Sequence, residues 1–234
     1  MNDLRKFASS VLLAILAVSV PAANAADDLN KVMARLDQSS TSFKAAQADI
    51  LWENVQTQPV PDDDKQVGTV IFQRKNGEVQ VALHLKTDNG NPIQKDMVYA
   101  GGVGKLYDAQ VKQMQVFKVG DRRSELEALL TLGFGGSGKD LQKSWTVTSA
   151  GTEQVGGVSA AKLQLVPLDA NLLKTVPKVL LWIDLDKGVA LKQQRFDPAG
   201  NYVIFTYSNI RLNGSVPGNA FDLKPPAGTQ IVNH

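Results

Sequence analysis

The sequence contains no cysteine among its 234 residues. Without thiols the chain has no disulfide bond, no zinc–thiolate site and no cysteine nucleophile, so packing alone must hold its core. Histidine is nearly absent too, because His84 and His234 are the only two. A Ser-His-Asp relay through His84 stays open, but no nucleophile-elbow sequence accompanies it. Since no histidines and carboxylates cluster at metal-ligand spacing, we expect no metal, no cofactor and no enzymatic activity.

The sequence also lacks an excess of either charge. It has 25 Lys and Arg against 23 Asp and Glu, a formal net charge of +2. This balance gives no electrostatic reason to expect nucleic acid or an acidic membrane surface as a partner. Hydrophobic residues make up 43% of the chain, which is sufficient for a sizeable core.

The one long apolar run lies at the N-terminus. Two basic residues precede the uncharged residues 7–20, and Ala23 and Ala25 then form a small-x-small pattern. This order is typical of a cleaved secretory signal peptide, and the run is too short for a comfortable membrane span; an uncleaved anchor is the alternative. We therefore expect a signal peptide at residues 1–25, cleavage after Ala25, one domain at residues 26–234 and a periplasmic location.

The chain beyond its first helix reads as a series of strands. That helix is expected to be capped by Asp27 or Asp28, and the polar residues 59–65 are interpreted as a solvated turn. Residues 79–85 alternate between the two faces of a strand, and the Asn-Gly pair just before them is the strongest short hairpin signal. Short links between the strands predict an antiparallel meander. The expected strands are 46–52, 68–74, 78–86, 95–100, 105–108, 113–119, 145–151, 160–167, 178–186, 190–196 and 202–211.

Residues 122–145 interrupt the strands with the period of a helix. Ser124 and Glu127 fit a capping box, and Ser137 with Asp140 fits the start of a second short helix. An apolar helical pair inside a long sheet has to cover something, so we expect a lid over an apolar cavity. The apolar face of the lid consists of Leu126, Leu129, Leu130 and Phe134.

The glycines of this insert match or nearly match two nucleotide-binding motifs. Residues 133–138 match G-x-G-x-x-G, and residues 133–139 nearly match a P-loop. Both motifs need a strand that ends at the first glycine, whereas these glycines follow a predicted helix. Asp140 also stands where a P-loop has its magnesium-binding hydroxyl. We therefore expect no nucleotide, and we interpret the glycines as a flexible hinge between the two lid helices.

Three segments together resemble one family. Residues 68–74 are similar to an early strand of this family, which ends in a basic residue. Residues 101–108 are similar to its G-K-x-x-x-Y-x-P motif, which is followed by a glutamine. Residues 221–231 contain F-x-x-x-P-P-x-G. In this order the segments resemble the LolA-like periplasmic outer-membrane lipoprotein carriers. Lys75 and Ala109 depart from the family pattern, since each replaces a proline.

The resemblance implies a mainly β (α+β) fold, an incomplete antiparallel β-barrel of about ten to eleven strands with a helical lid over an apolar cavity. Such carriers take acylated lipoprotein or lipid cargo from an inner-membrane ABC-type release complex to an outer-membrane acceptor. The resemblance assigns Arg74 hydrogen bonds to the lid in the empty state; the alternative is an exposed strand-end arginine. The expected lid and cavity residues are Arg74, Leu126, Leu129, Leu130, Phe134, Val81, Leu83, Leu181 and Ile183.

These expectations describe a monomeric carrier of lipidated protein or of another acylated ligand. Burial of one methylene contributes about 0.8 kcal/mol, so a sixteen-carbon chain gains about 12 kcal/mol gross. A carrier has to return part of that gain in order to release its cargo. Two alternatives remain: a sensor domain of the same fold that binds stray lipoproteins and docks on a membrane partner, and a cofactor-free enzyme that uses the cavity.

Overall fold

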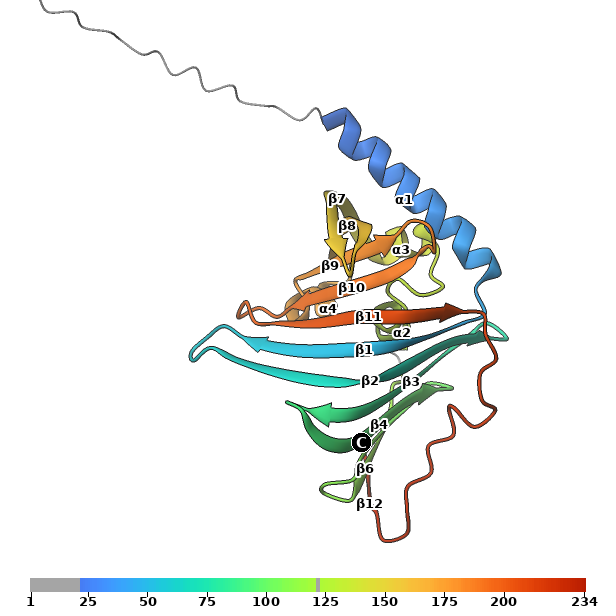
Figure 1. Ribbon diagram of the computed structural model, residues 1–234, viewed down its shortest axis with the longest axis vertical. Coiled ribbons are helices and arrows are strands. Elements are labelled where there is room, and N and C mark those ends of the chain that lie inside the picture. Colours follow the sequence, from blue (N-terminus) through green and yellow to red (C-terminus); the bar gives the residue numbers. More distant parts are fainter. Residues whose placement is uncertain (1–21, 121–122) are drawn as a thin grey trace, which may run out of the picture.

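The computed structural model describes residues 22–120 and 123–234, and the apolar run at 7–20 lies outside them. Within the described residues, twelve strands form one sheet in the order β12-β6-β5-β4-β3-β2-β1-β11-β10-β9-β8-β7 (Figure 1). Neighbouring strands are antiparallel, except that β12 runs parallel to β6. The strands are β1 (Ala45–Gln56), β2 (Asp62–Lys75), β3 (Glu78–Asp88), β4 (Asn91–Ala100), β5 (Val103–Asp108), β6 (Gln113–Lys118), β7 (Trp145–Val155), β8 (Val158–Pro167), β9 (Lys178–Asp184), β10 (Val189–Phe196), β11 (Tyr202–Leu212) and β12 (Gln230–Asn233).

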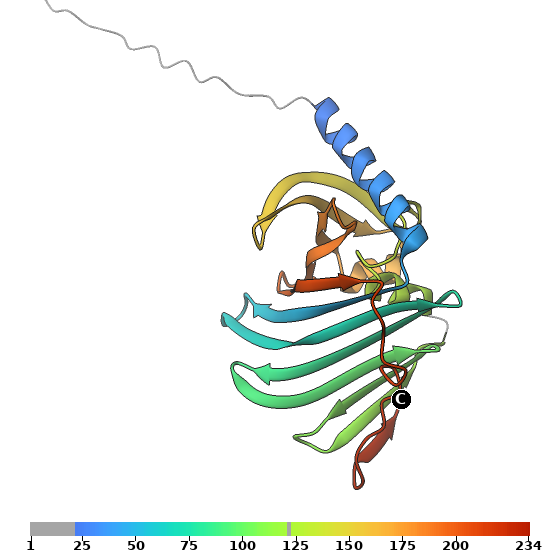
Figure 2. The same ribbon diagram turned by 45° about the vertical axis from the view of Figure 1, so that its right-hand side comes forward.

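The predicted fold class is confirmed: the protein is mainly β, with an unclosed and essentially antiparallel sheet. The described residues hold twelve strands, more than the ten to eleven expected from the sequence. The sheet twists strongly from one edge to the other (Figure 2). Its two edges are β12 and β7, and its centre is the pairing of β2 with β1.

The predicted hairpin between β2 and β3 is confirmed. Asn76 and Gly77 have positive φ angles of 53° and 80°, as both central residues of a two-residue hairpin turn require. From this turn the alternating residues Val79, Val81, Leu83 and Leu85 of β3 are buried on the concave face. His84 lies on the opposite face, where its Nδ1 is 2.7 Å from Oδ1 of Asp96. The hairpin therefore sets which side of β3 faces the core.

Several local predictions are wrong. Asp62, Asp63 and Asp64 belong to β2 and not to a turn, because the end of β1 continues and pairs with them. Lys65 lies 3.2 Å from Asp63, which offsets part of the acidic charge along this strand. The first helix begins before the expected aspartate caps, at Ala22.

Four helices are present in the described part of the chain: α1 (Ala22–Ser42), α2 (Arg123–Leu130), α3 (Gly138–Ser144) and α4 (Ala170–Thr175). Helix α4 was not expected from the sequence, and neither was β12. None of these helices has both the length and the apolar composition needed to cross a membrane.

Helix α1 is fixed to the turn between β9 and β10. Its Arg35 Nε donates to the carbonyl of Leu185 at 2.7 Å, and Ser39 Oγ donates to the carbonyl of Gly188 at 3.0 Å. Its apolar face places Val32, Met33 and Leu36 in the core. The outer half of α1 extends beyond the sheet (Figure 1).

Helix α3 packs closely against α1. The predicted start of α3 is confirmed, since Ser137 Oγ accepts a hydrogen bond from the backbone N–H of Asp140 at 3.0 Å. A Cβ at Gly138 would lie 2.6 Å from the carbonyl oxygen of Met33, so this contact needs glycine. Trp145 follows as the buried first residue of β7.

Candidate functional site: an apolar cavity beneath helix α2

An apolar cavity of about 240 Å³ lies between α2 and the concave face of the sheet. The strands around it bring alternate residues to one face: Ile50 pairs with Tyr207 and Trp52 with Phe205 across β1 and β11. Three lining residues are polar, and the others are aliphatic or aromatic. The lining consists of Ile50, Trp52, Val70, Phe72, Val81, Leu83, Met97, Leu129, Leu130, Gln193, Arg195, Phe205 and Tyr207.

The structure brings some of the predicted site residues to this cavity. Val81 and Leu83 from β3 line it on the sheet side, and Leu129 and Leu130 from α2 line it on the helix side. Leu126 is partly buried and packs against the same core, one helical turn before Leu130. These contacts place the apolar face of α2 over the concave sheet.

The other predicted apolar residues surround the cavity without lining it. Phe134 is 1% exposed, and its ring stacks on Phe72 with the centroids 4.2 Å apart. Leu181 and Ile183 of β9 are buried in the core, and Leu181 lines a separate void of about 120 Å³ beneath α3. Phe134 therefore supports the cavity wall through Phe72, and the role of all three side chains in ligand binding stays a prediction.

Arg74 lies at the end of β2, on the same face as Phe72. It pairs with Val79 across the hairpin, and its backbone N–H donates to the carbonyl of Lys44 at 2.9 Å. Among the described residues its guanidinium makes no hydrogen bond to α2 or to the turn after it. The role that the family resemblance assigns to Arg74 thus stays a prediction.

A polar contact near the middle of α2 holds this helix to the sheet. Glu127 Oε1 accepts hydrogen bonds from the Tyr99 hydroxyl at 2.7 Å and from Arg123 Nε at 2.8 Å. Burial and the Glu127 carboxylate raise the pKa of Tyr99 to about 12. The predicted capping box is wrong, because Ser124 lies inside α2 and the Glu127 carboxylate is engaged with Tyr99 of β4. We call the Tyr99–Glu127 contact the latch.

A second set of contacts fixes the turn after α2 to β10. The amide of Gln193 donates to the carbonyl of Leu132 at 2.6 Å, and the backbone N–H of Ala190 donates to the carbonyl of Gly133 at 2.9 Å. The roof of the cavity is thus attached to the sheet through Glu127 and again through the turn after α2. Nothing in the sequence pattern of β10 marked Gln193 as the residue that holds this turn.

The glycines of the turn are packed tightly. Gly133 has a φ of 76°, and a Cβ there would lie 2.3 Å from the Cβ of Ala190. Gly135 has a φ of 73°, and a Cβ there would lie 2.3 Å from the ring of Phe43. Close approach and a left-handed backbone therefore explain these two glycines. Whether they also act as a hinge stays a prediction.

Two of the polar residues in the cavity, Arg195 and Tyr207, were not among the predicted site residues. The Arg195 guanidinium lies over the ring of Phe205, 4.7 Å from its centroid. Loss of solvent lowers the pKa of Arg195, and burial raises the pKa of the Tyr207 hydroxyl. Both groups face the cavity between apolar neighbours.

The geometry offers hydrophobic binding and little else. In the described part of the chain, no group of three His, Asp or Glu side chains is placed to hold a metal ion. The His84–Asp96 pair lies on the face of the sheet opposite the cavity. A concave apolar chamber with a few convergent polar groups is the form of a binding site for a hydrophobic ligand.

The comparison with known sequences gives the family resemblance. No family model matches the chain. The outer-membrane lipoprotein carrier protein of Coxiella burnetii (strain RSA 331 / Henzerling II) is 23% identical over 164 residues, which cover 69% of this chain and 72% of that protein. The resemblance to the LolA-like lipoprotein carriers, drawn above from three segments, is confirmed by this match.

The comparison with solved structures concerns the fold alone. An uncharacterized conserved protein from Thermus thermophilus matches with a TM-score of 0.53 and 10% identity, over 88% of this chain and 98% of that one. MucB, solved with MucA from Pseudomonas aeruginosa, matches with a TM-score of 0.49 and 16% identity. That match covers 88% of this chain but 63% of the other chain, so this protein spans less than two thirds of its length.

Proposed function

We propose that this protein is a periplasmic carrier that binds the acyl chains of lipoproteins, or of a similar lipid, in the cavity beneath α2 and transfers them towards the outer membrane. The observation that carries the proposal is the cavity, whose lining is aliphatic or aromatic apart from Gln193, Arg195 and Tyr207. The name of the Coxiella burnetii relative supports lipoprotein as the class of cargo. In this proposal the protein acts by binding and release and not by catalysis.

Cargo entry requires α2 to move. The closed cavity of about 240 Å³ is smaller than the roughly 300–1,000 Å³ of ordinary ligand pockets. Helix α2 has eight residues and none of them is fully buried; it is held by the partly buried Leu126, Leu129 and Leu130 and by the latch. Opening gives up these contacts, and closing after release recovers the Tyr99–Glu127 hydrogen bond.

The contacts that α2 loses on opening and recovers on closing also favour release of the cargo. One acyl chain gains about 12 kcal/mol gross on full burial, which is more than a carrier retains if it must hand the chain on. Breaking the latch and the contacts of the turn after α2 returns part of that gain. We assign Arg74 to the same balance: its guanidinium would bond the helical segment in the empty state and lose those bonds when cargo enters.

The compartment and partners complete the proposal. Residues 1–25 are removed after Ala25, and residues 26–234 form the single carrier domain in the periplasm. Cargo comes from an inner-membrane ABC-type release complex and passes to an outer-membrane acceptor.

Charged substitutions on α2 test the proposal. Leu129→Asp and Leu130→Asp each place a carboxylate against the cavity, where an unpaired charge is costly. Both are expected to lower the affinity for an apolar dye and for an acylated peptide by about tenfold or more. The matched control is Leu173→Asp on α4, a helical leucine that is 40% exposed and outside the cavity.

The readouts are equilibrium fluorescence titration for binding and circular dichroism for folding. If all three variants fold and bind the dye as the unaltered protein does, α2 covers no binding cavity and the proposal fails.

A further inference from the structure

Strand β10 places an arginine in an otherwise apolar wall. In the register of the sheet, Arg195 pairs with Val179 of β9 on one side and with Val203 of β11 on the other. Its side chain is partly buried, and its guanidinium lies 4.7 Å from the ring centroid of Phe205. The positive charge is thus held against aromatic and aliphatic surface by the strand that carries it.

This charge has no anionic partner in the described part of the chain. Arg195 makes no hydrogen bond or ion pair there, and the one group that perturbs its charge directly is the Tyr207 hydroxyl. Desolvation lowers the pKa of Arg195, yet an arginine side chain remains protonated in proteins. A partly desolvated charge without a bonded counter-charge is unfavourable, so the empty cavity holds a cation that a bound anion would stabilise.

The position of Arg195 suggests how a ligand would lie. Arg195 lines the apolar cavity beneath α2 and also a second, more polar cavity of about 380 Å³ at the ends of β1 and β2. The second cavity carries Asn54, Asp64 and Asn201. The guanidinium therefore stands where an apolar chamber meets a polar opening, which is the place for the head of an amphiphile whose chain enters the chamber.

The charges around this junction favour a small anion over a larger one. Asp62 and Asp64 of β2 and Asp197 beyond β10 line the same polar opening. The side chains of these three aspartates repel a ligand head group that carries several negative charges. A ligand head group with one carboxylate, and so one negative charge, reaches the guanidinium with the least repulsion. The planar guanidinium also matches a carboxylate with two parallel N–H···O bonds.

We propose that the cavity binds a single-chain carboxylate amphiphile, a fatty-acid-like ligand, with its carboxylate bonded to Arg195 and the Tyr207 hydroxyl and its chain beneath α2. This inference rests on the proposed carrier function, because both use the same apolar chamber. It adds a charged head-group site that the acyl chains of a lipoprotein, which are neutral esters and amides, do not require.

Matched ligands test the charge directly. Laurate and lauryl alcohol have the same chain and differ in the head group, so each is used to displace an apolar dye from the purified full-length protein. The unaltered protein is expected to prefer laurate by about tenfold or more, as a charge-assisted bidentate contact implies. Equal affinities for the two ligands overturn the inference without any substitution.

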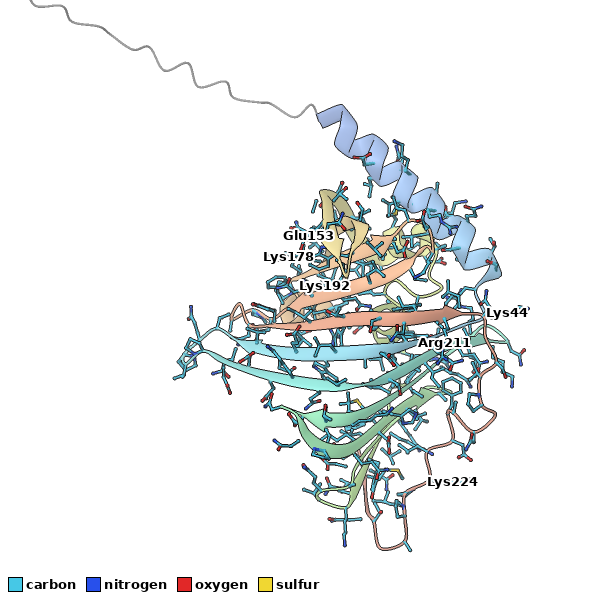
Figure 3. The ribbon with its side chains drawn as sticks, in the orientation of Figure 1. Lys44, Glu153, Lys178, Lys192, Arg211 and Lys224 are labelled. Carbon is cyan, nitrogen blue, oxygen red and sulfur yellow. The ribbon has the colours of Figure 1, made fainter. Side chains whose placement is uncertain are left out.

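Substitutions then assign the effect to one residue. Arg195→Gln is expected to abolish the preference for laurate while the affinity for lauryl alcohol is retained, and Arg195→Lys is expected to retain part of the preference. The control is Arg211→Gln, an exposed arginine near the end of β11 (Figure 3), which should leave both affinities unchanged. An Arg195→Gln variant that folds and still prefers laurate refutes the assignment.

The outcomes separate this inference from the carrier proposal. If the alcohol and an acylated peptide bind as well as laurate does, the head-group site is wrong and the carrier proposal stands. If the alcohol, laurate and the acylated peptide all fail to bind, the carrier proposal itself fails.

Discussion

Removing the latch hydroxyl should make the protein bind apolar ligands more tightly. The substitution is Tyr99→Phe, which keeps the buried ring on β4 and deletes the hydrogen bond of 2.7 Å to Glu127 on α2. This bond exists when α2 is closed over the cavity and is lost when α2 moves away. Its removal therefore destabilises the closed state and leaves the open, ligand-accepting state unaffected.

The size of the effect follows from the kind of bond. A hydrogen bond to a charged group contributes about 1.5–3 kcal/mol. Glu127 keeps its second donor, Arg123 Nε at 2.8 Å, so the carboxylate is not left without a partner. We therefore take the lower end of the range, at which the population of the open state, and with it the apparent affinity, rises about tenfold.

The assay is fluorescence titration with an apolar dye, together with stopped-flow measurement of its association rate. The apparent affinity and the association rate are both expected to increase in Tyr99→Phe. The control is Tyr107→Phe on β5, a tyrosine that is 5% exposed, as Tyr99 is, but has no contact with α2 among the described hydrogen bonds. Unchanged dye affinity in a folded Tyr99→Phe protein would refute the reasoning, because the latch would then not oppose ligand entry.

The remaining predictions concern Arg74, the N-terminus and the buried tyrosines. Arg74→Leu is expected to bind acylated ligand about tenfold more tightly yet to pass it poorly to an acceptor; a ligand dissociation rate equal to that of the unaltered protein would make Arg74 a strand-end charge only. N-terminal sequencing of the periplasmic fraction should begin at Ala26, and a full-length product that requires detergent would contradict the carrier proposal. Because burial raises the pKa of Tyr99 from 10.0 to about 12, the folded state favours its neutral form; this contribution to stability is complete below pH 10.0 and is lost as the pH rises through about 12. The tyrosinate absorbance titration should therefore lose a late step in Tyr99→Phe, and the step of Tyr207, whose pKa is also raised by burial, should remain; a curve identical to that of the unaltered protein would contradict this.

Features that depend on neighbours in the sequence were predictable. The Asn-Gly turn fixed the hairpin of β2 and β3, and the alternation along β3 identified the concave side. The three- and four-residue spacing of the leucines in α2 placed Leu129 and Leu130 at the cavity. In each case the signal lies within one element, so its period reveals the face that is buried.

Features that depend on distant pairing were not predictable. Strand β12 has four residues and forms because Gln230 pairs with Gln113 of β6, far away in the sequence. In β10, the run from Lys192 to Arg195 is polar at every position, so alternation assigns no face to it. It is the register with β9 and β11 that turns Gln193 and Arg195 towards the cavity. Polar residues that face an apolar site, such as Gln193 and Arg195, could therefore be identified only when the partner strands were known.

The order of the strands gives α2 and α3 a mechanical role in addition to covering the cavity. The chain leaves the sheet at β6, next to the β12 edge, and re-enters it at β7, the opposite edge. The two helices therefore form a tether between the margins of an open sheet whose hydrogen bonds run unbroken from one margin to the other. Any flattening of the sheet would separate its margins, and the contour length of this tether would limit how far. In the proposed carrier, the number of residues in this connection, and not the width of the sheet, would then limit the size of the cargo.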